Sequence, residues 1–163
     1  CWQMARRFLS DPDLDPKTRA AGLLVLLYGI QLTRIVTITR TQIDTSSRPV
    51  TLTVGAEPIG LPEILGDAIS DLADAAKHHP EGWLFPGRNP GNHLTPGPLS
   101  RRLRAEGLLA GSARTTALIE LTRQMHPRIV SDLLGITTSS AAAWSRLAGG
   151  DWSDYPALRS DHA

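Results

Sequence analysis

The chain has 163 residues, of which 41% are hydrophobic and 20% are charged, a balance typical of one globular domain with its own core. This composition excludes a disordered tail, a collagen-like repeat and a coiled coil. The only cysteine, Cys1, excludes a disulfide scaffold and a cysteine-based zinc site. No apolar run approaches the roughly 20 residues that cross a bilayer, so we expect a cytoplasmic protein with no membrane partner.

The start of the chain suggests a larger protein. It begins at Cys1 rather than methionine, and no signal-peptide pattern follows. We therefore expect one domain over residues 1–163, the C-terminal portion of a longer protein, with residues 151–163 as a tail.

Charge is unevenly distributed although the net charge is only +1. Residues 44–82 carry seven acidic and two basic side chains, whereas residues 83–150 carry three acidic side chains and eight arginines. The planar fork of arginine donates two hydrogen bonds to a phosphate, which favours a phosphate-binding face. The alternative is a genomic composition bias, because 15 of the 17 basic residues are arginine. The eight arginines of the basic block are Arg88, Arg101, Arg102, Arg104, Arg114, Arg123, Arg128 and Arg146.

Helical spacing of apolar residues predicts three helices in the first quarter of the chain. The first covers residues 2–9. Asp15 followed by proline marks the start of a second, which is apolar nearly all round, runs to residue 27 and ends at Gly29. A third pattern covers residues 31 to about 39, with many β-branched side chains.

The period then changes to that of a strand. Apolar residues alternate with threonines over residues 48–61, and Gly55 marks a turn, which predicts a small antiparallel hairpin. Pro62 opens a helix that ends at residues 78–80. Glycines and prolines over residues 86–97 predict a surface loop.

Four more helices follow from residue 95 onward. Thr95 with its following proline caps the first, and Ser112 caps the second, which runs to Met125. The last two cover residues 127–134 and about 139–148. The fold class is therefore mainly α (α+β), with one small antiparallel β-hairpin or sheet.

The common catalytic motifs are absent. The sequence holds no glycine-rich phosphate loop, no HExxH pattern and no EF-hand. A metal site built from His78, His79, His93 and His126 is disfavoured, because two of them lie at a helix end and none has a partner four residues on. We expect no metal and no cofactor.

Residues 127–148 have the pattern of a helix-turn-helix, with Gly135 at the turn. In such units the first residues of the second helix meet base edges in the major groove. Those residues are Thr137, Thr138, Ser139 and Ser140, and Arg146 would lie near the DNA backbone. The alternative is two core helices joined by a glycine turn.

Residues 29–44, GIQLTRIVTITRTQID, resemble a segment of the tyrosine recombinase, or phage integrase, family. Further segments resemble the family in the same order, at residues 83–86 (WLFP), 93–96 (HLTP), 113–117 (ARTTA) and 133–135 (LLG). The resemblance covers roughly residues 20–148. It implies the catalytic-domain fold of that family and double-stranded DNA as the partner.

The resemblance also implies that the catalytic set is not intact. These recombinases cut DNA with a tyrosine nucleophile, while arginines, a lysine and histidine-type residues stabilise the transition state. The tyrosine position falls on Trp144, one residue short of the family spacing, and the hairpin turn at Gly55 holds no lysine. Only Arg114 keeps its family identity. The family positions are occupied by Gln31, Gly111, Arg114, Ile136 and Trp144.

The resemblance and the arginine block together imply a non-catalytic, nucleoid-associated DNA-binding domain. For Arg114 the alternative is a structural ion pair with Glu120 or Asp132. The side chains expected to contact DNA are Gln31, Arg34, Arg101, Arg102, Arg104, Arg114, Thr137, Thr138, Ser139, Ser140 and Arg146.

Two other functions stay open. One is an active site-specific recombinase with relocated catalytic groups, in which Tyr28 or Tyr155 would be the nucleophile. The other is a protein-interaction module that self-associates or docks a partner in the former DNA groove or on its acidic face, with tryptophans as anchors although the core is the alternative place for most of them. The acidic residues are Asp67, Asp71 and Asp74, and the tryptophans are Trp2, Trp83, Trp144 and Trp152.

Overall fold

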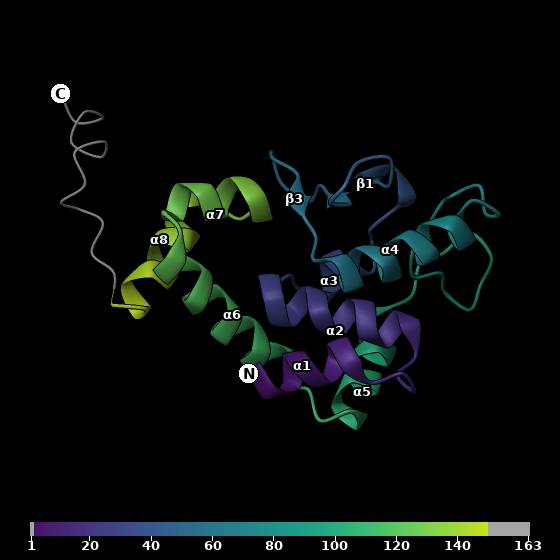
Figure 1. The fold of residues 1–163 in the computed structure, drawn as a ribbon, viewed down its shortest axis with the longest axis horizontal. Coiled ribbons are helices and arrows are strands. Elements are labelled where there is room, and N and C mark those ends of the chain that lie inside the picture. Colours follow the sequence, from purple (N-terminus) through teal and green to yellow (C-terminus); the bar gives the residue numbers. More distant parts are fainter. Residues whose placement is uncertain (1, 150–163) are drawn as a thin grey trace.

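A computed structural model describes residues 2–149, so Cys1, Trp152, Tyr155 and the predicted tail lie outside the described residues. Within that range the chain forms eight α-helices and a three-stranded antiparallel sheet (Figure 1). The elements are α1 Trp2–Ser10, α2 Pro16–Tyr28, α3 Leu32–Ile35, β1 Ile43–Asp44, β2 Thr51–Leu52, β3 Ile59–Gly60, α4 Glu63–Ala76, α5 Pro96–Ala105, α6 Ala110–Gln124, α7 Pro127–Leu134 and α8 Thr138–Leu147. The mainly helical fold class is confirmed.

Helix α2 forms the centre of the core and packs against α1, α4, α5 and α6 (Figure 1). Its predicted ends are confirmed. The Asp15 carboxylate accepts the Thr18 backbone N–H at 3.0 Å, and Gly29 closes the helix at φ 63°, a conformation that favours glycine. Leu23 and Leu24 are fully buried, as the all-round apolar pattern predicts.

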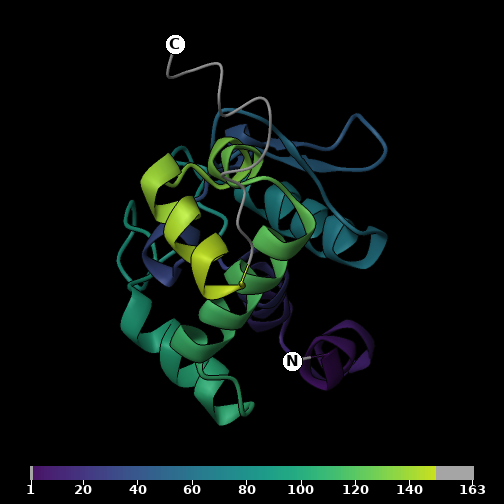
Figure 2. The ribbon, with the colours of Figure 1, turned by 90° about the vertical axis from the view of Figure 1, so that its left-hand side faces the viewer.

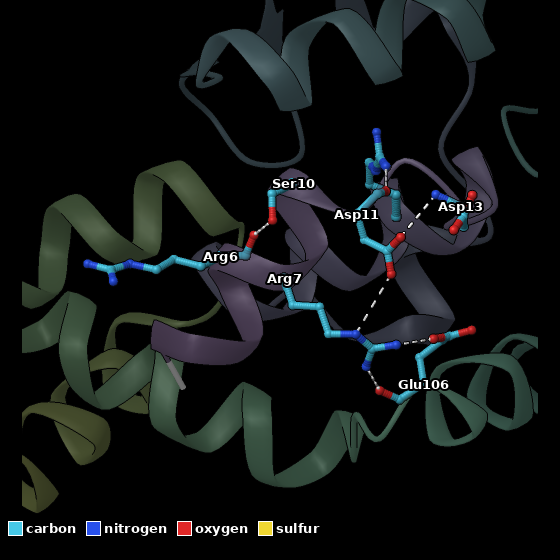
Figure 3. A network of polar contacts seen from close by, with 7 residues as sticks. Arg6, Arg7, Ser10, Asp11, Asp13 and Glu106 are labelled. Carbon is cyan, nitrogen blue, oxygen red and sulfur yellow. Dashed lines mark hydrogen bonds and ion pairs between the residues drawn. The ribbon is translucent and has the colours of Figure 1, made fainter.

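Helix α1 is fixed at both of its faces. On the buried face, Phe8 packs where a Cβ at Gly22 would lie 2.2 Å from its ring, so α2 needs glycine there. On the other face, the Arg7 guanidinium contacts both the side chain and the backbone carbonyl of Glu106 at the end of α5 (Figure 3). Asp11 lies 3.9 Å from the same guanidinium. The α1 segment is thereby fastened to two other helices.

The helix predicted over residues 31–39 is wrong beyond residue 35. The backbone of Ile38 accepts the Leu84 N–H at 3.1 Å, and Arg40 donates to Gly82 at 2.9 Å. The β-branched residues 35–39 favour this pairing over helix, and a short 3₁₀ turn, Arg40–Gln42, follows.

The predicted hairpin is confirmed as β2 and β3, with Leu52 opposite Ile59. A third strand, β1, pairs with the other edge of β2, in the order β1-β2-β3. Strand β1 is two residues long, too short to show a period in the sequence.

The predicted N-cap of α6, Ser112, is wrong by three residues, because the cap is Leu109. The helix begins at Ala110, because the Leu109 carbonyl already accepts the Ala113 N–H at 3.0 Å. Ser112 lies inside the first turn instead of capping it. None of the helices within residues 2–149 is both long and apolar enough to cross a membrane.

Candidate nucleic-acid interface

The tip of the β2–β3 hairpin is packed on the end of α7. The Ala56 and Glu57 N–H groups both donate to the Asp132 carbonyl, at 2.8 and 3.2 Å. A Cβ at Gly55 would lie 2.3 Å from that carbonyl oxygen and 2.6 Å from the Gly135 nitrogen. The close approach of the two backbones therefore requires glycine at position 55.

Arg34 joins this hairpin tip to the α7–α8 turn. Its Nη2 donates to the Val54 carbonyl at 2.5 Å, and its Nη1 donates to the Leu134 carbonyl. The side chain is half-buried between α3, the hairpin and α7. The sequence predicts a DNA contact for Arg34, but part of its hydrogen-bonding capacity is used inside the protein.

Arg114, on α6, lies over an aromatic ring. Its Cζ is 5.8 Å from the centroid of Trp144 on α8, within the range of a cation–π contact. Its Nε is buried without a hydrogen-bond partner, and burial lowers the pKa of the guanidinium from its usual value. The ion pair weighed for Arg114 is wrong within residues 2–149, because Glu120 pairs with Arg123 at 3.5 Å and Asp132 contacts the hairpin through its carbonyl.

A small cavity lies between these groups, lined by Gln31, Arg34, Arg114, Leu134 and Ile136. Its volume is about 10 Å³, about the space that one water molecule needs. Residues that lie a hundred positions apart in the sequence thus line one cavity. Gln31 is the most exposed of them, at the N-terminal cap of α3 with no side-chain cap bond. Gly111 is exposed in the first turn of α6.

Tyr28, a candidate relocated nucleophile, has the wrong surroundings for that role. It borders a small cavity with Leu121, Met125 and Val130, and burial raises the pKa of the phenol to about 12. A nucleophilic hydroxyl needs a base or a lowered pKa, so this phenol is not activated. The other candidate, Tyr155, lies outside the described residues.

The arginines of α5 form an exposed basic surface. Arg101, Arg102 and Arg104 are all exposed, and none of their side chains forms a hydrogen bond or ion pair within residues 2–149. In Figure 2, α5, α3 and the start of α8 lie along the left-hand side of the molecule, and α1 and α4 lie on the right. The helices that carry the α5 arginines, Gln31 and residues 138–140 therefore lie on one side of the molecule.

The residues of the first turn of α8 are exposed and therefore available to a ligand. Thr137 caps the helix by accepting the Ser140 N–H at 3.1 Å, and residues 137–140 are exposed. Arg146 follows Trp144 by two positions, about 200° around an α-helix, so it faces away from Arg114. Arg146 follows Ser139 by seven positions, two turns of the helix, so it lies on the same face of α8 as that predicted contact.

A cavity beside the start of α5 was not predicted as functional. The loop over residues 86–95 and the start of α5 border a cavity of about 820 Å³, lined partly by Arg88, Arg101 and Arg102. The glycine and proline content predicts the loop but not the cavity. No cluster of residues that could hold a metal ion occurs within residues 2–149.

Solved structures of three DNA recombinases share this fold. XerA recombinase superposes with a TM-score of 0.66 at 16% identity, over 99% of this chain and 63% of that one. The Tn1549 transposon integrase in complex with transposon right-end DNA gives 0.60 at 15% identity, over 88% of this chain and 62% of that one. XerH site-specific recombinase bound to its difH substrate gives 0.58 at 14% identity, over 92% and 51%.

The fold is that of a tyrosine recombinase catalytic domain. The chain spans between about half and 63% of the length of these recombinases. No family model and no curated protein sequence matches it. At 14–16% identity the likeness shows the fold, and the site has to be interpreted from its own residues.

Proposed function

We propose that this chain is a DNA-binding domain with the tyrosine recombinase fold that binds duplex DNA without cutting it. The observation that carries the proposal is the contact between Arg114 and Trp144, 5.8 Å from guanidinium carbon to ring centroid. By the resemblance, Arg114 is the retained phosphate ligand and Trp144 stands near the place of the nucleophile. Tryptophan has no oxygen with which to attack a phosphodiester.

The missing groups are too many for residual catalysis. Removing one preorganised stabiliser of a transition state typically costs about 100- to 1000-fold in rate. Here Gln31, Gly111 and Ile136 replace charged or proton-carrying family groups, and the hairpin turn holds no lysine. Such losses are not additive, but the covalent intermediate itself requires the absent nucleophile.

The binding surface would consist of the α5 arginines, Gln31 and the first turn of α8. Exposed arginines without protein partners contact phosphates, which supply most of the sequence-independent affinity. The hydroxyls of Thr138, Ser139 and Ser140 would donate to phosphates or meet base edges as in a helix-turn-helix. Two of the three similar recombinases were solved with DNA bound, which supports DNA as the ligand.

A salt titration of DNA binding tests the proposal. The affinity for a labelled duplex should fall steeply between about 50 and 200 mM salt, because phosphate contacts release counterions. Replacing Arg101, Arg102 and Arg104 by glutamine should weaken binding to all sequences equally and flatten the salt slope by roughly 0.9 per lost contact. Arg123→Gln is the matched control, because Arg123 lies on α6, outside the proposed surface, and pairs there with Glu120. Absence of binding at about 50 mM salt would refute the proposal.

A covalent trapping assay tests the active alternative. With a nicked duplex that prevents religation, we expect no protein–DNA adduct after denaturation. An adduct that disappears in Tyr155→Phe or in Tyr28→Phe would show a working relocated nucleophile and overturn the non-catalytic proposal.

A further inference from the structure

A cavity that is already formed lies beside the predicted DNA surface. Its volume is about 820 Å³, and it opens between the loop of residues 86–95 and the start of α5. Two of its lining residues, Arg101 and Arg102, belong to the exposed arginines of α5. The cavity is thus continuous with the surface proposed above to contact phosphates.

The loop that forms its wall is held in place by four polar contacts. Gly87 donates to the Asn92 carbonyl at 2.7 Å, and Leu94 donates to the Phe85 carbonyl at 2.7 Å. The Trp83 indole N–H donates to the Gly91 carbonyl at 3.0 Å, and Asn92 closes the turn by donating to Asn89 at 3.2 Å. These bonds fix the wall without a ligand, so little ordering is left to oppose binding.

Three arginines without counter-charges border the cavity. The side chains of Arg88, Arg101 and Arg102 form no hydrogen bond and no ion pair within residues 2–149. The carboxylate of Glu81 lies near Gly91 and does not line the cavity. Like charges gathered around one concavity repel one another, and an anion would relieve the repulsion. Arginine suits a phosphate group in particular.

The other residues that line the cavity include aromatic rings and amides, which can bind a planar ring with polar edges. The Trp83 and His93 rings meet edge-to-face, with centroids 5.0 Å apart and planes at 75°. The His93 Nδ1 lies 2.7 Å from the Leu94 carbonyl, which can only accept, so this nitrogen donates and Nε2 is left to a ligand. The Asn89 and Asn92 amides supply both donors and acceptors.

We infer that this cavity binds one unpaired nucleotide of a DNA strand, with its phosphate on the arginines and its base against Trp83 and His93. The volume falls in the range of sites for small organic ligands, about 300–1000 Å³, and far exceeds what a phosphate alone would fill. A base held in a duplex stack cannot enter it. The inference deepens the proposed function, on which it rests: the preferred ligand is a duplex with an unpaired nucleotide.

Three matched labelled probes test the inference: a perfect duplex, the same duplex with one extra thymidine, and the same duplex with an abasic nucleotide at that place. We expect the thymidine bulge to bind about 5- to 150-fold more tightly than the duplex, the range that one stacked base supplies. The abasic probe should lose most of that gain. Equal affinity for all three probes would overturn the inference and leave the proposed function intact.

Two variants connect the preference to the cavity. His93→Leu removes a ring and an acceptor, and Asn92→Ala removes an amide while the Asn92 backbone still holds the loop. Both should lower the affinity for the bulge toward that of the duplex, and Arg123→Gln should leave the ratio unchanged. If the ratio of bulge affinity to duplex affinity is unaffected by His93→Leu and Asn92→Ala, the preference arises elsewhere and the site is refuted. Circular dichroism confirms that each variant is folded.

A readout independent of duplex binding separates the two proposals. Added thymidine 5′-monophosphate should shift the NMR signals of the His93 ring and of the Arg101 side chain, with smaller shifts for Arg123. Such shifts without any duplex binding would support the cavity and refute the proposed function. Duplex binding without shifts from the mononucleotide and without a bulge preference would support the proposed function and refute the cavity as a nucleotide site.

Discussion

At the scale of single residues, two arginines at the centre of the fold have different roles. Arg34 donates to the carbonyls of Val54 and Leu134 and thereby holds the hairpin on α7. Arg114 makes no such bonds and lies over Trp144 instead. The sequence shows which residue types occupy the family positions. It cannot show how Arg34 is used, because that depends on where the hairpin register places the Val54 carbonyl.

Arg34→Met should destabilise the fold without changing the salt dependence of DNA binding. The variant loses two charge-assisted hydrogen bonds, which together contribute on the order of 2–4 kcal/mol to the free energy of unfolding. Urea unfolding measures the loss. Arg102→Met, which removes an exposed and unbonded guanidinium, should stay within about 0.5 kcal/mol of wild type. Equal stability of the two variants would contradict the role given to Arg34.

The contact between Arg114 and Trp144 should appear as a coupling energy. In a double-mutant cycle with Arg114→Met and Trp144→Leu, we expect a coupling of about 0.5–1 kcal/mol in the free energy of unfolding. Arg123, about 13 Å further along α6, gives the control cycle, with a coupling near zero. Trp144→Leu should also tighten DNA binding, because it frees a guanidinium for phosphate.

Tyr28 predicts a loss of stability at alkaline pH. Its pKa in the folded chain is about 12, above the usual value of 10.0. Between these pH values the unfolded phenol has released its proton while the folded one keeps it, so the free energy of unfolding falls as the pH rises through this window. Below pH 10 the contribution of Tyr28 to stability is fully present. Urea unfolding at about pH 9 and about pH 11 should show a smaller fall in Tyr28→Phe than in wild type. An identical fall in both proteins would refute the assignment.

At the scale of elements, the parts predicted correctly are those with local signals. Helix α2 has an acidic cap and a terminal glycine, and β2 and β3 show a strand period. The end of α3 and the whole of β1 could not be predicted, because they are decided by partners distant in sequence. Ile38 pairs with Leu84, and Ile43 pairs with Leu52.

Gly55→Ala tests the docking of the hairpin on α7. A Cβ there would lie 2.3 Å from the Asp132 carbonyl, so the tip must lift and lose the two hydrogen bonds that it donates. We expect a destabilisation of about 1–3 kcal/mol, with faster amide exchange at Ala56. Gly111→Ala is the control, since nothing lies within 4 Å of its Cβ position and alanine favours a helix. A control variant that loses as much stability would refute the argument.

At the scale of the whole molecule, charge is separated between two sides. Helix α4 carries exposed Asp67 and Asp71, and α5, which carries the exposed arginines, lies on the other side of the molecule in Figure 2. Such a separation orients an approaching polyanion before contact, and salt weakens the effect. The charge blocks were visible in the sequence, but their placement on opposite sides follows from the packing of both helices against α2.

Neutralising the acidic side should speed DNA association at low salt only. Asp67→Asn with Asp71→Asn removes two repelling charges far from the contact surface, so the association rate should rise by about 2- to 3-fold near 50 mM salt and return to wild type near 200 mM. Stopped-flow fluorescence measures the rate. A rise that persists at the higher salt would mean that α4 itself contacts DNA.

The water-sized space beside Arg114 also determines which small inhibitors the protein admits. Vanadate and other tetrahedral oxyanions imitate a phosphorus centre during strand transfer, and they are larger than a water molecule. Such an ion could enter this space only by displacing lining side chains such as Leu134 and Ile136. Oxyanion mimics of the cleavage step should therefore stay out of this space, whereas the partly exposed side of Arg114 remains open to a phosphate of the DNA backbone.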